Sequence, residues 1–226
     1  QQRLWTLDRL EGPSPVYNIP MALRLEGRLN IAALSKTLAA IIARHEPLRT
    51  VIIEDSLGDA QGYLLPAPEA ATLMTVTDLS GIDSRLERER QLRELITQET
   101  SKPFDLAKDL SLRAGVVILG RQESVFMLTM HHQAGDGVSM AVLTRELMQG
   151  YSAYCAGTEP QWAPLPIQYC DWAAWQQASL EQGLEAKVAR AKARLGNAPE
   201  SLTLPLDYSR DPERMRRAAY MSVRVE

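Results

Sequence analysis

The chain has 226 residues, of which 45% are hydrophobic and 23% are charged, and its formal net charge at pH 7 is -3. This composition is typical of a globular protein with one large or two small domains, and it lies well outside the disordered and membrane classes. The weak negative charge and a pI of about 5.7 argue against a sequence-independent nucleic-acid binder, which needs clustered Lys and Arg. We therefore expect no nucleic-acid partner.

The first predicted elements are a strand and a helix. Between Asn18 and Leu29, apolar residues alternate with smaller or polar ones, which indicates a strand with one buried face. Asn30 is suited to cap a helix after this strand, and apolar residues then recur at helical spacing until Pro47 ends the pattern. The pattern therefore predicts a strand followed directly by a helix.

Further strands and a charged helix are predicted next. Residues 51–65 hold two apolar runs around a turn-rich segment, which favours a hairpin or a loop between neighbouring strands. A short strand is expected at Leu73 to Val76. Residues 84–100 are dense in Arg and Glu with an apolar stripe, so they predict a surface helix whose charges are solvated.

Paired strands and a helix are predicted around two adjacent histidines. Residues 112–119 and 124–130 are rich in Val, Leu, Ile and Met, and the short segment between them favours a turn. Helical spacing begins after Asp136-Gly137 and ends near Gly157. The histidines are thus predicted to lie at a strand-to-helix turn.

The sequence pattern changes more than once between residue 160 and the end of the chain. Prolines mark a connection between residues 160 and 166, and residues 167–195 then indicate mostly helical structure with Gly183 as a weak point. Met221 to Val225 alternates like a strand. Taken along its length, the chain favours one lobe of the α/β class, a mixed sheet flanked by helices.

The cysteines and the hydropathy pattern indicate a compartment. Only Cys155 and Cys170 occur in the sequence, which excludes a four-cysteine zinc site and a dense disulfide framework and makes the reducing cytoplasm the expected location. No apolar run reaches about 18 residues, the length that a membrane span needs. Residues 1–5 also lack the apolar core of a signal peptide. We therefore predict neither export nor membrane spanning.

The three histidines are the candidate chemical groups. His131 and His132 are adjacent, and because neighbouring side chains on a strand point to opposite faces, only one of them can face a given cavity. An imidazole changes charge near neutral pH, so it can accept a proton or orient an amine. The alternative is a histidine that packs against the core with one ring nitrogen bonded to the backbone.

Asp136 has two interpretations. It precedes a predicted helix, where an aspartate is a good N-cap and suits the positive end of the helix dipole. Alternatively it pairs with Arg113, a charge within an otherwise apolar strand segment, because a buried charge needs a partner. On the second interpretation Asp136→Ala leaves Arg113 buried without a partner, and the chain loses stability or solubility.

Several other classes of site are not supported. Adjacent histidines lack the one-face spacing of the His-Glu-x-x-His type and have no neighbouring cysteine, so no metal site is expected. A serine-hydrolase Gly-x-Ser-x-Gly elbow does not occur. The glycines also form neither a phosphate-binding loop nor a dinucleotide fingerprint.

Residues 130–139, Met-His-His-Gln-Ala-Gly-Asp-Gly-Val-Ser, resemble the HHxxxDG core motif of condensation domains of nonribosomal peptide synthetases and of their acyltransferase relatives. Three further segments match in the family's order, namely residues 1–7, 44–50 and 169–175. Residues 17–20 are similar to domains that join two L-configured residues. A departure is Val138, where a tryptophan is common; valine there also occurs in related epimerisation domains.

The resemblance implies the fold and the partners. It predicts a chloramphenicol-acetyltransferase-like lobe, with 1–226 as the N-terminal lobe and roughly 200–226 leading into a C-terminal lobe that is missing here. Donor and acceptor peptidyl carrier proteins then bring thioesters on phosphopantetheine arms to a tunnel between the lobes, and the acceptor amine attacks the donor thioester to form a peptide bond. A neighbouring adenylation domain is a further implied partner, and the domain itself binds no cofactor. The isolated half-domain is expected to be inactive.

The resemblance also implies roles for individual residues. His132 is the catalytic residue, the backbone N–H of Gly137 at the helix start is a candidate oxyanion donor, and His131 packs away from the tunnel. Asp136 and Arg113 form a structural ion pair. His45 and Arg49 belong to the scaffold. The alternatives are an epimerisation domain, a standalone acyltransferase acting on soluble alcohols or amines, and a non-catalytic carrier-binding module.

Overall fold

The computed structural model describes residues 1–181, 183–199 and 205. The chain divides into two compact units, Gln1–Gln168 and Tyr169–Glu226. The strand predicted at Met221 to Val225 lies outside the described residues, as does nearly all of the expected lead into a second lobe.

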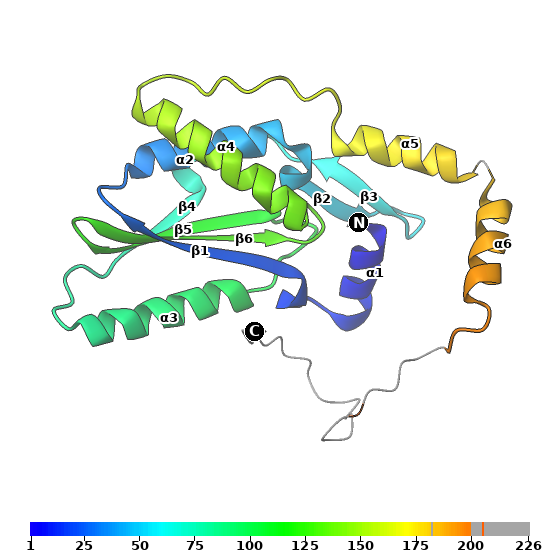
Figure 1. The fold of residues 1–226 in the computed structure, drawn as a ribbon, viewed down its shortest axis with the longest axis horizontal. Helices are drawn as coiled ribbons and strands as arrows, with labels where there is room; N and C mark the ends of the chain where they lie inside the picture. The colour runs from blue at the N-terminus through cyan, green and yellow to red at the C-terminus, as the bar shows by residue number, and fades with distance from the viewer. Residues whose placement is uncertain (182, 200–204, 206–226) are drawn as a thin grey trace, which may run out of the picture. The chain divides into compact units, whose positions relative to one another are not determined.

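A four-stranded mixed sheet forms the centre of the first unit (Figure 1). Its order is β1-β6-β5-β4; β6 pairs antiparallel with both β1 and β5, and β4 lies parallel to β5. The strands are β1 (Asn18–Glu26), β4 (Met74–Asp78), β5 (Leu112–Gly120) and β6 (Glu123–His131). A separate antiparallel hairpin consists of β2 (Thr50–Glu54) and β3 (Ala60–Leu64). These elements confirm the strands predicted between residues 18 and 130, and of the hairpin or loop predicted for residues 51–65 the structure has the hairpin.

Helices cover both faces of the sheet in the first unit. The helices there are α1 (Gln2–Glu11), α2 (Ile31–Arg44), α3 (Arg85–Ser101) and α4 (Gly137–Cys155), with short 3-10 turns at Pro15–Tyr17, Glu46–Arg49 and Ala70–Thr72. Helices α2 and α4 lie over one face, and α3 lies under the other (Figure 1). Asn30 caps α2 through a bond from the Ala33 N–H to its side chain, as predicted. The mixed sheet flanked by helices that the sequence predicts is confirmed.

The two faces of the sheet hold separate apolar clusters. Between the sheet and helices α2 and α4, the buried residues include Leu38, Ile41, Phe126 and Leu128, each at most 1% exposed. Burying one such side chain stabilises the fold by roughly 1.5–3 kcal/mol. On the opposite face, residues 117, 119, 125 and 127 pack against α3. Because β5 and β6 are covered on both faces, their sequences form nearly continuous apolar runs.

Helices α2 and α4 approach closely at Gly150. A Cβ at this position would lie 2.6 Å from Thr37 Cγ2 and 3.1 Å from Trp162, so only glycine fits without a shift of its neighbours. This contact fixes α4, and therefore the turn at its start, against the rest of the unit.

The second unit contains two described helices, α5 (Tyr169–Glu181) and α6 (Leu184–Leu195). Gly183 precedes α6 with a φ of 81°, a left-handed conformation that glycine adopts without steric conflict. The sequence prediction of a helical segment with a weak point at this glycine is confirmed. Among the described helices of the whole chain, none has both the length and the apolar character needed to cross a membrane.

Candidate functional site

The adjacent histidines lie where β6 ends and α4 begins. The backbone holds this turn at three points: His131 N donates to Ser111 O at 2.9 Å, His132 N donates to Tyr17 O at 2.9 Å, and Ala134 N donates to His131 O at 3.0 Å. The turn is therefore fixed to the segment before β5 and to the 3-10 turn before β1. Its position is set by backbone bonds to segments that are distant in sequence.

The side chain of His132 is exposed. Among the described residues its imidazole makes no hydrogen bond or ion pair, in contrast to the other two histidines. The ring lies close enough to Asp136 to contribute to the lowered pKa of that carboxyl group. An exposed imidazole without a partner in this part of the chain is available to a substrate.

His131 faces the interior. It is 4% exposed, its Nδ1 accepts a hydrogen bond from Gln133 N at 3.2 Å, and its ring meets the rings of Tyr17 and Phe104 edge-on at 6.4 and 5.6 Å. Burial, followed by the neighbouring charges of His132 and Arg113, lowers the pKa of His131 to about 4. His131 is therefore neutral at pH 7 and serves packing.

The buried His131 makes stability depend on pH. Its pKa falls from 6.5 in the unfolded chain to about 4 in the folded chain, so between these values only the unfolded chain binds the proton. The stabilisation is complete above pH 6.5 and decreases as the pH falls towards 4, by up to about 2–3 kcal/mol. Urea unfolding at a series of pH values should show this slope. A His131→Gln variant with the same slope would contradict the assignment.

Asp136 and Gly137 begin α4. Asp136 is the N-cap: its Oδ1 accepts hydrogen bonds from Ser139 N and Ser139 Oγ, both at 2.9 Å. These two bonds, the backbone one first, lower the pKa of the Asp136 carboxyl. Gly137 is exposed, and a Cβ built on it would meet no atom within 4 Å, so a reactant can approach its backbone.

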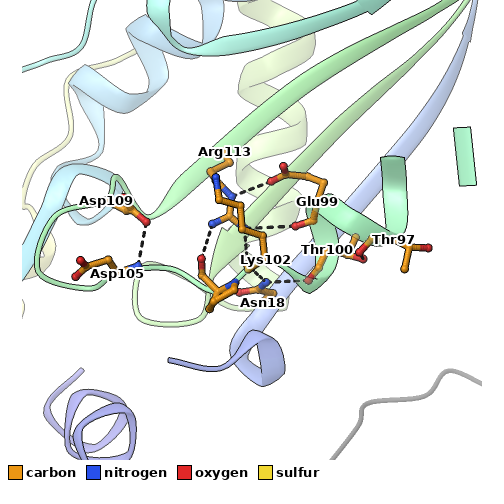
Figure 2. Close-up of polar contacts among 9 residues, drawn as sticks. Asn18, Thr97, Glu99, Thr100, Lys102, Asp105, Asp109 and Arg113 are labelled. Atoms are coloured by element: carbon orange, nitrogen blue, oxygen red, sulfur yellow. Dashed lines mark hydrogen bonds and ion pairs between the residues drawn. The ribbon is translucent and has the colours of Figure 1, made fainter. Parts of the chain in front are cut away.

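The predicted ion pair between Asp136 and Arg113 is wrong. Arg113 Nε donates to Glu99 Oε1 at 2.8 Å, and its guanidinium also donates to backbone carbonyls at the end of α3 (Figure 2). The reason is strand alternation: Leu112 and Ala114 face α2 and α4, so Arg113 between them points to the opposite face, towards α3. Asp136 instead caps the start of α4, which is the first of the two interpretations given for it in the sequence analysis.

His45 and Arg49 both make contacts within the first unit. His45 Nε2 lies 2.6 Å from Oε2 of the buried Glu146 in α4, and Arg44 Nε donates to the same carboxylate at 3.3 Å. Arg49 donates through NH1 to Leu65 O at 2.6 Å. The first set of contacts joins the end of α2 to α4, and the second anchors the end of the β2–β3 hairpin.

An apolar groove follows α4 beside β1. It has a volume of about 650 Å³ and is lined by residues 21, 140, 141, 144, 145, 148 and 149. Met140 is in the first turn of the helix, where its N–H donates to Asp136 O at 3.0 Å. The groove therefore reaches the first turn of α4, the helix that follows the histidine turn. No group of three or more His, Cys, Asp or Glu among the described residues is placed to hold a metal ion.

Comparison with known proteins decides the family. The condensation domain model matches residues 1–226. The chain belongs to the condensation domain family. It is 40% identical over 219 residues to the dimodular nonribosomal peptide synthase of Bacillus subtilis (strain 168), and 41% identical over 227 residues to the malpibaldin synthetase of Mortierella alpina. The resemblance found in the sequence is confirmed.

Solved structures agree with this family. The X-domain from teicoplanin biosynthesis is similar to this condensation-domain chain with a TM-score of 0.80 and 30% identity, over 93% of this chain and 45% of that one. The first condensation domain of the CDA synthetase matches in fold, with a TM-score of 0.72 and 23% identity, over 90% of this chain and 50% of that one.

The matches cover only part of each relative. The chain corresponds to about half of these solved domains. The sequence match to the Bacillus synthase takes in 94% of this chain but 9% of that protein, and the match to the malpibaldin synthetase takes in 100% of this chain but 4% of that protein.

The corrected role of Asp136 in this condensation-domain chain changes the expected effect of Asp136→Ala. Loss of an exposed N-cap should lower the melting temperature by about 2–4 °C. The larger loss expected from a buried, unpaired Arg113 should not occur. Thermal unfolding of the single variants and of the Asp136→Ala, Arg113→Gln double variant checks this. If the stability loss of the double variant differed strongly from the sum of the two single losses, Asp136 and Arg113 would have to interact after all.

Sequence reasoning missed three side chains around the turn. Gln133 is buried, and its side-chain Nε2 donates to Ser111 Oγ at 2.8 Å. Its backbone carbonyl accepts a hydrogen bond from Gln1 Nε2 at 3.1 Å. Phe104 lies behind His131, and Asn18 is paired with His131 across β1 and β6. The signals available were a polar residue at the start of a predicted strand and one of only two phenylalanines. Neither signal reveals which residues these side chains contact in the fold.

Proposed function

We propose that this chain is the N-terminal lobe of a condensation domain that forms peptide bonds in nonribosomal peptide synthesis, with His132 at the reaction centre. The observation that supports this most is the exposed imidazole of His132, which has no hydrogen-bond or ion-pair partner among the described residues and lies at the turn before α4, the helix that lines the apolar groove. His131 is buried and neutral, so it does not compete for this role.

The proposed reaction joins two carrier-bound thioesters. The acceptor α-amine attacks the donor thioester carbonyl, a C–N bond forms, and the C–S bond to the donor's phosphopantetheine arm breaks. His132 accepts a proton from the attacking amine and returns one to the leaving thiolate, so no other reactant is needed. An imidazole suits both transfers because it changes charge near neutral pH.

The negative oxygen of the tetrahedral intermediate needs hydrogen-bond donors. Gly137 is exposed and begins α4, so its backbone N–H lies at the positive end of the helix dipole. We assign to it a share in stabilising this oxygen. Asp136 fixes the helix start through its bonds to Ser139, and so keeps this N–H in place.

The groove along α4 suits one wall of the substrate tunnel. Its apolar lining includes Met21, Met140 and Met148, and methionine adapts to ligands of varied shape. The second wall is then the C-terminal lobe, because this chain corresponds to half of the solved condensation domains. Donor and acceptor carrier proteins and a neighbouring adenylation domain are the proposed partners. The half-domain alone is proposed to lack turnover.

A non-catalytic binding role is the second candidate. A complex of the X-domain and OxyB from teicoplanin biosynthesis is known, and that X-domain is 29% identical to this chain with a TM-score of 0.76. A domain of this fold can therefore bind a partner protein, and binding without chemistry is a specific alternative for this chain.

One assay separates the candidates. The chain is extended through the second lobe, both carrier proteins are loaded with aminoacyl thioesters, and product on the acceptor carrier is measured. We expect a dipeptidyl thioester only when both lobes are present. Inversion at the donor α-carbon without a new bond would indicate an epimerisation domain. Transfer to a soluble amine or alcohol would indicate a standalone acyltransferase, and carrier binding without product would indicate a binding module.

A further inference from the structure

Two side chains from different strands close the C-terminal end of α3. The last carbonyls of a helix have no partner within it. Arg113 of β5 donates through NH2 to Lys102 O at 2.7 Å and through NH1 to Pro103 O at 3.0 Å. Asn18 of β1 donates through Nδ2 to Thr100 O and to Lys102 O, both at 2.9 Å. Figure 2 shows both side chains converging on Lys102, whose carbonyl accepts from each.

Helix capping alone does not explain this arrangement. Water or a single side chain satisfies the end of most surface helices, whereas here two strands supply donors to one carbonyl. The Oδ1 atom of Asn18 is buried and has no hydrogen-bond partner among the described residues. A buried acceptor without a partner destabilises the fold. The favourable contribution of the Asn18 amide therefore comes from the two hydrogen bonds that its Nδ2 donates.

The clamp formed by Arg113 and Asn18 fixes Phe104, the residue that follows the capped segment. The Arg113 guanidinium lies 3.7 Å from the centroid of the Phe104 ring, and Phe104 is 2% exposed. The Phe104 ring in turn meets the ring of His131 at 5.6 Å and an interplanar angle of 62°. The clamp thus places an aromatic wall directly behind His131.

His131 connects the clamp to the turn that holds His132. Its Nδ1 accepts from Gln133 N, the residue after His132. A second connection runs through the backbone: Asn18 is paired with His131 between β1 and β6, and the carbonyl of the preceding Tyr17 accepts from His132 N. The clamp is therefore joined to both sides of His132, through His131 and through Tyr17.

We propose that Arg113 and Asn18 are positioning residues for His132, acting through Phe104, His131 and the backbone of Tyr17. This inference rests on the function proposed above for His132. It replaces the ion pair with Asp136 as the way in which Arg113 supports the site. A small displacement of a catalytic group is enough to lower the rate of the chemical step greatly, which makes the effect measurable.

The test uses the complete two-lobed domain with both carrier proteins. Arg113→Lys keeps the charge but loses the planar fork that reaches the carbonyls and covers Phe104, and Asn18→Ala removes only the two donor bonds. We expect kcat for dipeptidyl formation to fall by about tenfold to a hundredfold. KM for each carrier should stay within about twofold, because carrier binding is not altered.

The matched control is Arg24→Lys. Arg24 of β1 also pairs with a glutamate of α3, Glu89, but it lies opposite Val125, well away from the His131 end of the strand. This variant should keep the wild-type kcat.

The outcomes separate this inference from the proposed function. Wild-type kcat in both clamp variants, measured below their melting temperatures, overturns the positioning role, as does failure of both variants to fold, since the clamp would then be purely structural. If only one variant folds, its kcat decides. His132→Ala is measured beside them. If His132→Ala retains turnover, the proposed function itself is contradicted. If His132→Ala loses turnover while the Arg113 and Asn18 variants keep the wild-type kcat, only this inference is contradicted.

Discussion

His132→Ala in the complete two-lobed domain should lower kcat for dipeptidyl formation by about 10²- to 10⁴-fold, the usual contribution of a positioned general base. The melting temperature should not change. The side chain is exposed and makes no hydrogen bond among the described residues, so its removal takes no hydrogen bond from the described part of the fold. Product on the acceptor carrier and thermal unfolding measure the two quantities separately.

His45 provides the matched control, because His131 belongs to the path proposed to position His132. His131 is 4% exposed, and His45 is bonded to a buried carboxylate, so His131→Gln and His45→Gln should each lower stability. At a temperature where the His45→Gln variant remains folded, it should turn over normally. Turnover by His132→Ala at the wild-type rate would show that the imidazole takes no part in the chemistry.

Glu146→Ala should cause the largest loss of stability, about 3–5 kcal/mol, because it breaks a buried ionic cluster. Glu146 is 5% exposed, and its carboxylate contacts Arg44 Nε at 3.3 Å and His45 Nε2 at 2.6 Å. Without it, the half-buried Arg44 side chain keeps, among the described residues, its bond to Ala163 O and its contact with the Trp162 ring. Urea unfolding of this chain measures the change.

The control for Glu146 is an exposed glutamate in an ion pair. Glu94 pairs with Arg90 one helical turn away on α3, and its side chain is 61% exposed. Exposed pairs of this kind contribute little, so Glu94→Ala should leave the unfolding midpoint unchanged. Equal losses for Glu146→Ala and Glu94→Ala would show that burial of the Glu146 cluster is unimportant.

Much of the fold follows from local sequence patterns. Alternation predicts β1, the continuous apolar runs predict β5 and β6, and helical spacing predicts α2 and α4, because each pattern reflects which face of an element is buried. The turn that holds His131 and His132 follows from the change between the two periods. These are properties of neighbouring residues, so a single sequence contains them.

The partner of Arg113 could not be predicted in the same way. Strand β5 is apolar on both faces, so alternation does not show which face the arginine occupies. Helix α3 was expected to have solvated charges, and several of its charged residues are exposed. Its Glu99, however, has a side chain only 24% exposed and pairs with Arg113 of β5. Pairing of this kind depends on tertiary packing, which charge patterning alone does not reveal.

The position of Phe104 behind His131 is also a tertiary property. Phe104 lies between α3 and β5 in a segment without a regular pattern. Only the assembled sheet brings together Asn18, Arg113 and this ring. The sequence thus predicts where the proposed catalytic imidazole lies, whereas the contacts behind it depend on the assembled fold.

The most direct test of the account is the single-turnover rate of peptide-bond formation in the complete domain, with both loaded carriers saturating. His132→Ala should slow this chemical step by about a hundredfold or more, while the affinity for each carrier, measured with an unreactive donor thioester analogue, stays unchanged. An unchanged single-turnover rate, or a loss explained entirely by weaker carrier binding, would contradict a role for His132 in the reaction.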